Sequence, residues 1–161
     1  MRHIYKILPW KRAIYASVAV LLCLILFNFY GLYTNKFYFL KPDNYVFPIV
    51  AIVHFLYLYV VWFKITEKEL PDPKMRNIEY VLYAVMAVYV YKIVDTLLIL
   101  LSYSDYDDHV IPSTFIPLGI LILFLHLLLP LLALLCIKYR QIHIGKYNFE
   151  NFNDNMNYWN N

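Results

Sequence analysis

Glycine is scarce in this chain, and so are the short motifs that mark common enzymes. Only three of the 161 residues are glycine, which argues against a flexible or collagen-like chain and leaves no glycine-rich phosphate loop. The sequence also lacks GxSxG and HExxH, the motifs of α/β-hydrolases and of many zinc proteases. We therefore expect no conventional hydrolase or transferase.

Cysteine is equally sparse. Cys23 and Cys136 lie inside apolar runs, without a CxxC or CxxCH motif and without the Cys and His spacing of a zinc site. Both are expected to be packed thiols. The sequence thus predicts no metal site and no cofactor. Its formal net charge of +3 is small and gives no reason to expect nucleic-acid binding.

Apolar length is what the chain has in excess. Hydrophobic residues make up 62% of it, more than a water-soluble core of this size needs. A hydrocarbon layer about 30 Å thick is crossed by about 20 apolar helical residues. Four runs meet this length, at residues 13–33, 46–65, 79–103 and 113–137. The sequence predicts an all-α integral membrane protein: a four-transmembrane-helix, up-down-up-down bundle over residues 1–140 with a tail at 141–161.

Lysine and arginine gather on alternate sides of these runs. One group precedes the first run, lies in or next to the 66–78 connection, and follows the last run. Its members are Arg2, Lys6, Lys11, Arg12, Lys64, Lys68, Lys74, Arg76, Lys138, Arg140 and Lys146. The other side has only Lys36 and Lys41. In membrane proteins, short loops on the cytoplasmic side are enriched in lysine and arginine. We therefore expect both termini in the cytoplasm, in a bacterial cytoplasmic (inner) membrane.

Charged residues occur inside the third run, in the stretch YVYKIVDTLLILL. Lys92 and Asp95 are three residues apart, and Thr96 follows Lys92 by four, so all three share one helix face. His54 and His126 lie at comparable depth on the second and fourth runs. Because a charge facing lipid is costly, the pattern predicts a polar layer at half membrane depth that faces protein.

This layer has two interpretations. Lys92 and Asp95 form either an intrahelical ion pair that fixes helix packing, or a site where Asp95 is protonated and deprotonated as an ion or proton relay with His126 and His54. Pro130 removes the hydrogen bond to the carbonyl of His126, which predicts a kink or a water site there.

Two further segments are candidate sites. The 102–112 connection gathers Asp105, Asp107 and Asp108 beside His109, which is either a solvated loop or an acidic outer vestibule for cations. The tail is rich in asparagine, which favours disorder. Its aromatic residues could instead anchor a cytoplasmic partner; they are Tyr147, Phe149, Phe152, Tyr158 and Trp159.

Four functional hypotheses follow. The favoured one is a non-enzymatic accessory subunit or homo-oligomeric component of a membrane complex, in contact with the lipid bilayer. The second is an ion- or proton-conducting component that uses Asp95 and the histidines. The third is a subunit that binds haem b through His54 and His126. The last is an enzyme whose site is assembled within the membrane.

Overall fold

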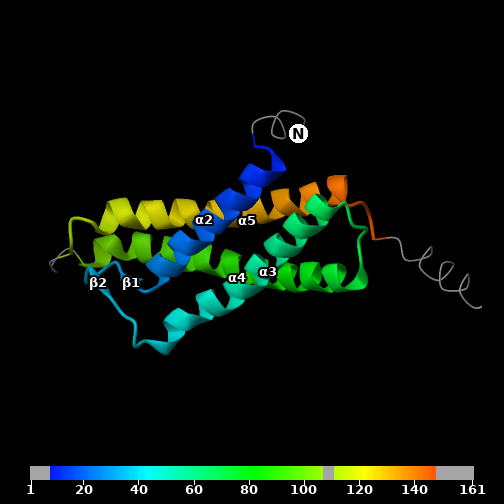
Figure 1. Ribbon diagram of the computed structural model, residues 1–161. Helices are drawn as coiled ribbons and strands as arrows, with labels where there is room; N and C mark the ends of the chain where they lie inside the picture. Colours follow the sequence, from blue (N-terminus) through cyan, green and yellow to red (C-terminus); the bar gives the residue numbers. More distant parts are fainter. Residues whose placement is uncertain (1–7, 107–110, 148–161) are drawn as a thin grey trace, which may run out of the picture.

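The computed structural model describes residues 8–106 and 111–147, without the side chains of residues 105 and 106. Its main elements are the helices α2 (Trp10–Asn28), α3 (Val46–Glu67), α4 (Pro73–Leu101) and α5 (Phe115–His143). All four are long and apolar enough to cross a membrane. Successive helices run in opposite directions (Figure 1). The all-α bundle expected from the sequence is therefore confirmed in its helices.

The helices pack in a ring, with α2 between α3 and α5, and α4 between the same two on the other side. One end of the bundle holds the start of α2, the α3–α4 connection and the end of α5; we call it the basic end. The other end holds the α2–α3 connection and the start of α5, and we call it the hairpin end (Figure 1).

The α2–α3 connection contains a small β-hairpin that the sequence analysis missed. The first apolar run was predicted to be helical to residue 33, but α2 ends at Asn28. Strand β1 (Tyr30–Gly31) then pairs antiparallel with β2 (Lys36–Phe37). Asn35 closes the turn with a positive φ of 53°, which asparagine tolerates better than most residues. A short 3₁₀ helix, η1 (Pro42–Tyr45), leads into α3.

The other helix boundaries also move. α4 starts six residues before the predicted position 79, and α5 continues past 137 to His143, inside the predicted tail. Both extensions are helical turns rich in polar residues, and a hydropathy criterion does not detect such turns. α5 also passes through Pro130 without interruption. A 3₁₀ segment, η2 (Ser102–Tyr106), follows α4.

The bundle buries small and polar residues of α2 against α5. Ala13, Ser17, Val20 and Leu24 are spaced three or four residues apart and form one buried stripe. The Ser17 hydroxyl donates to the Ala13 carbonyl at 2.8 Å, and its oxygen lies 3.7 Å from the sulfur of Cys136. Small side chains let membrane helices approach closely.

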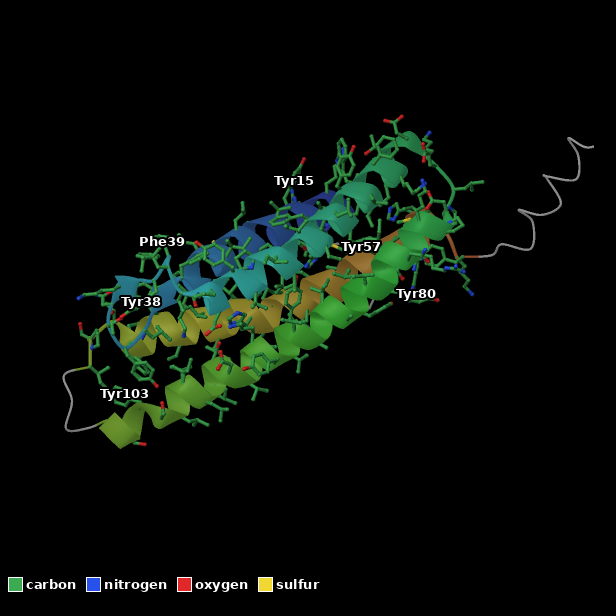
Figure 2. The ribbon with its side chains drawn as sticks, turned by 90° about the horizontal axis from the view of Figure 1, so that it is seen from below. Tyr15, Tyr38, Phe39, Tyr57, Tyr80 and Tyr103 are labelled. Carbon is green, nitrogen blue, oxygen red and sulfur yellow. The ribbon has the colours of Figure 1, made fainter. Side chains whose placement is uncertain are left out.

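Large apolar side chains cover the outside of the helices. Leu22, Ile52, Leu98 and Leu131 are all more than half exposed. Figure 2 shows Tyr57 between the helices, whereas Tyr15 and Tyr80 project outward. Such an apolar exterior is unusual for a water-soluble monomer. Together with the four apolar helices, it supports a membrane protein.

The start of α4 gives a test of local stability. The Asp72 carboxylate accepts a hydrogen bond from the backbone N–H of Met75 at 2.7 Å, and it lies 2.8 Å from Lys64 Nζ. Pro73 follows at the first helical position, where a missing N–H costs nothing. Partial burial alone would raise the pKa of Asp72, but the hydrogen bonds from Lys64 and the Met75 backbone outweigh it and hold that pKa below its usual value.

We expect Asp72→Ala to lower the free energy of unfolding by about 1 kcal/mol at pH 7. Asp72→Asn should retain the capping part of this contribution, because asparagine also caps helices, and lose the part due to the contact with Lys64. Since the folded-state pKa is lowered, the charge-dependent part of the Asp72 contribution is present at neutral pH and is lost as the pH falls below about 4. Thermal unfolding in detergent at pH 7 and pH 3 checks this. Equal losses for Asp72→Ala at both pH values would contradict it.

Candidate functional site

The charged face predicted on α4 lines a pocket at the hairpin end. The Thr96 hydroxyl lies 2.8 Å from the Lys92 carbonyl and 3.2 Å from Nδ1 of His126. Lys92 Nζ lies 3.8 Å from the Asp95 carboxylate. α4 and α5 thus bring Lys92, Asp95, Thr96 and His126 together. The sequence predicted these residues in one layer with His54.

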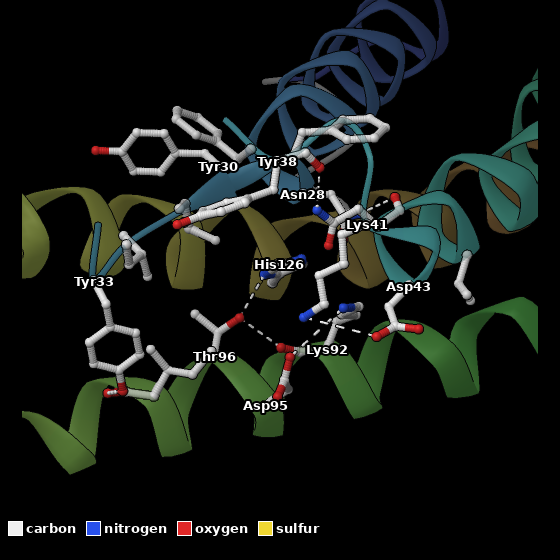
Figure 3. Close-up of a pocket in the computed structure, with 18 of the residues that line it drawn as sticks. Asn28, Tyr30, Tyr33, Tyr38, Lys41, Asp43, Lys92, Asp95, Thr96 and His126 are labelled. Carbon is white, nitrogen blue, oxygen red and sulfur yellow. Dashed lines mark hydrogen bonds and ion pairs between the residues drawn. The ribbon is translucent and has the colours of Figure 1, made fainter. Parts of the chain in front are cut away.

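The pocket has a volume of about 710 Å³. Its other walls come from the end of α2, the β-hairpin and the segment before α3, including Asn28, Tyr38, Lys41 and Asp43 (Figure 3). A cavity of this size is in the range of small-molecule binding sites. Lys41 and Asp43 were not among the predicted site residues, because no local pattern indicated that this connection folds over α4.

His54, which the sequence groups with these residues in one polar layer, does not line this pocket. It is fully buried, and its Nδ1 lies 3.1 Å from the Tyr89 hydroxyl. Ring contacts run from His54 to Tyr89, from Tyr89 to Phe47 and from Phe47 to His126, with centroid distances of 5.8, 5.7 and 6.0 Å. These rings link the two histidines through packed side chains.

The pocket charges are held loosely. Lys92 and Asp95 have side-chain exposures of 21% and 40%, and no hydrogen bond joins them within residues 8–106 and 111–147. Lys41 and Asp43 are similarly 3.9 Å apart and more exposed. Both pairs are at the outer limit of an ion pair. The ammonium and carboxylate atoms of both pairs can therefore bind a further polar group.

A second polar cluster at the basic end was missed by the sequence analysis. Arg140 donates two hydrogen bonds to the Glu79 carboxylate, at 2.8 and 2.5 Å, and the two side chains are only 3% and 5% exposed. The Tyr57 and Tyr147 hydroxyls donate to the same carboxylate at 3.2 and 3.0 Å. Arg140 had been counted only as a flanking positive charge, and Glu79 only as the start of a run.

Glu79 does carry a signal that the sequence offers. It shares a helix face with Met75 and Leu82, four residues before and three after, and both of these are buried. An acidic residue on the apolar face of a helix needs a buried partner. The partner on α5 is 61 positions away, so no local pattern identifies it.

The predicted tail anchors fall partly outside the described residues. The anchors outside the described residues are Phe149, Phe152, Tyr158 and Trp159. The same holds for three residues of the acidic loop, Asp107, Asp108 and His109. Tyr147 packs on its own chain: its ring lies under the Arg140 guanidinium at 4.2 Å, and its hydroxyl reaches Glu79. Burial and the Glu79 charge raise the pKa of Tyr147, which keeps this hydroxyl a donor. Its predicted role as an anchor for another protein therefore competes with an intramolecular contact.

Comparisons with known proteins identified no similar protein. A scan against protein-family models and searches of curated proteins and of solved structures returned no match. Functional inference therefore depends on the pocket and on the packing below it.

Proposed function

We propose that this chain is a four-span protein of a bacterial cytoplasmic membrane, with both termini in the cytoplasm. The charge distribution supports this orientation. The basic end carries Lys68 in the α3–α4 connection and Lys74 and Arg76 in the first turns of α4, whereas the α2–α3 connection carries only Lys36 and Lys41. In this orientation the pocket opens on the outer side of the membrane. The lipid bilayer is then the protein's main contact.

Within that membrane, the protein acts as a non-enzymatic accessory subunit or homo-oligomeric component of a larger assembly, with the pocket as its functional surface. One observation carries the proposal. Asp95 lies six residues inside the end of α4, about 9 Å by the helical rise, and its side chain is 40% exposed. A charge at such depth is costly unless something covers it. Since the described chain covers Asp95 only in part, another molecule completes the pocket.

Native mass spectrometry and crosslinking of the protein extracted from its own host membrane test this role. The expected result is a defined species that contains additional copies of the chain or other membrane proteins. Recovery of a free monomer alone, under detergent conditions that preserve known complexes of the same membrane, would refute the role as a subunit.

Proton movement is the second candidate. Ionisable side chains occur at successive levels of the bundle interior, with His126 in the pocket, His54 beside Tyr89, and Glu79 at the basic end. The rings of Phe47 and Tyr89 separate the first two levels. A relay would have to pass this packed layer, so a permanently open pore is disfavoured. Proton-flux measurements on a Phe47→Ala variant distinguish the two candidates.

A further inference from the structure

We propose that the pocket at the hairpin end binds a dipolar head that carries a phosphate and an ammonium group, as in the zwitterionic phospholipid phosphatidylethanolamine or in free phosphoethanolamine. This rests on the proposed function in one respect, namely that another molecule completes the pocket. It adds the chemistry of that molecule. Four features of the pocket support it: its charges, its aromatic walls, its apolar lining and its open side.

The charges favour a ligand with both signs. The pocket contains Lys41 and Lys92 as well as Asp43 and Asp95. Their 3.8 and 3.9 Å separations contrast with the bidentate pair of Glu79 and Arg140. A simple anion would pair with the lysines and remain close to the two carboxylates, and a simple cation would remain close to the lysines. A dipolar head satisfies both, so it leaves no charge uncompensated at depth.

Aromatic walls suit the ammonium group. Tyr30, Tyr33, Tyr38 and Tyr91 line the pocket together with Asp43 and Asp95. Ammonium groups bind over aromatic faces, particularly where an anion is also close and water is displaced. Tyrosine rings beside carboxylates therefore provide the positive end of the ligand with two kinds of contact.

Tyr38 is fixed in this wall by its neighbours. A Cβ at Gly31 would come within 2.6 Å of the Tyr38 ring, so glycine permits the ring to lie over the hairpin. The Tyr38 hydroxyl donates to Thr34 at 2.9 Å, and its carbonyl accepts from the Asn44 amide at 2.9 Å. The wall is thus built before a ligand arrives, which lowers the entropic cost of binding.

The open side of the pocket suits a lipid. Phe27, Ile99 and Ile122 add apolar lining. Val46 is the only α3 residue in that lining, and both Val46 and Tyr91 of α4 are at least half exposed. The rim between α3 and α4 is therefore apolar and faces outward, where a membrane protein contacts acyl chains. A headgroup could enter here from the outer leaflet with its acyl chains still in lipid.

The test uses the purified full-length protein, stripped of lipid by detergent exchange, and native mass spectrometry with phosphatidylethanolamine or phosphatidylglycerol added at equal concentration. Both lipids carry a phosphate, but only the first has an ammonium group. We expect wild type to retain phosphatidylethanolamine about tenfold better, the value of one charge-assisted contact. Asp95→Asn should abolish the preference, and Lys92→Gln should weaken retention of both lipids by about tenfold.

Matched controls separate loss of the site from loss of the fold. Glu67→Gln and Lys138→Gln remove exposed charges at the basic end and should leave both the preference and the retention unchanged. Asp43→Asn alters a rim side chain that is 83% exposed, so it should fold normally and reduce the preference about threefold, as a screened surface charge would.

Each outcome decides the proposal. Equal retention of the two lipids by wild type, or a full preference in both Asp95→Asn and Asp43→Asn, would overturn it. Free phosphoethanolamine forms the third arm: if it binds the wild type and displaces the lipid, the ligand is a soluble dipolar molecule, and if it does not, the ligand is the lipid. These measurements use the isolated protein, so they can fail while the subunit test succeeds, and the reverse also holds.

Discussion

Arg140→Ala is expected to lower the free energy of unfolding by about 3 to 5 kcal/mol, the largest effect of any single change considered. The substitution removes a guanidinium that donates two hydrogen bonds to Glu79 and also lies over the Tyr147 ring. It leaves the Glu79 carboxylate almost fully buried, with only the hydroxyl donors of Tyr57 and Tyr147 to offset its charge. Titration with SDS in mixed micelles, followed by tryptophan fluorescence, measures the loss.

Lys138→Ala is the matched control for Arg140→Ala. It removes a positive charge two positions away on the same helix, but its side chain is exposed, so we expect a loss below about 0.5 kcal/mol. The double variant Glu79→Leu with Arg140→Leu should be less destabilised than Arg140→Ala, because no unpaired charge is left in the interior. If Lys138→Ala and Arg140→Ala cost the same, the buried pair contributes nothing beyond a surface charge.

Much of the fold follows from hydropathy, because long apolar runs have few alternatives to membrane-crossing helices. The ends of the helices do not follow from it. Residues 29–33 carry no charge and so extend the uncharged run before them, yet Gly31 and Asn35 favour a turn, and the chain forms a hairpin. The early start of α4 depends on the Asp72 cap and Pro73, which are local signals independent of apolar content.

The candidate site was predictable where its residues belong to one helix. The spacing of Lys92, Asp95 and Thr96 fixes their common face, and this face does line the pocket. His126 joins it through Thr96. His54 does not line the pocket. Its helix is apolar on almost every side, so the sequence does not indicate which face turns toward the pocket. The pairing of Glu79 with Arg140 depends on how α4 packs against α5, which no local pattern contains.

Phe47 lies between the pocket and the buried level of His54 and Tyr89. It is fully buried, and its ring contacts both His126 in the pocket and Tyr89, the partner of His54. In a water-soluble core, Phe→Ala costs about 3 to 5 kcal/mol, partly from transfer to water. In a membrane protein the unfolded state leaves the side chain in lipid, so the substitution removes mainly packing contacts and little transfer energy. We therefore expect Phe47→Ala to lower the free energy of unfolding by about 2 to 3 kcal/mol in the SDS titration.

The same substitution decides whether the interior can relay protons. Removing the ring joins the pocket to the level of His54, whose Nε2 is buried and without a hydrogen bond in the described structure. If the polar levels form an interrupted relay, Phe47→Ala proteoliposomes should show a proton leak, measured with an internal pH dye, and His126→Ala or Asp95→Asn in the same background should suppress it. Phe63→Ala, on the partly exposed outer surface of α3, is the control. Equal proton permeability of wild-type and Phe47→Ala proteoliposomes would refute the relay, because removing the blocking ring would then have opened no path. Ligand binding at the pocket would remain as the supported function.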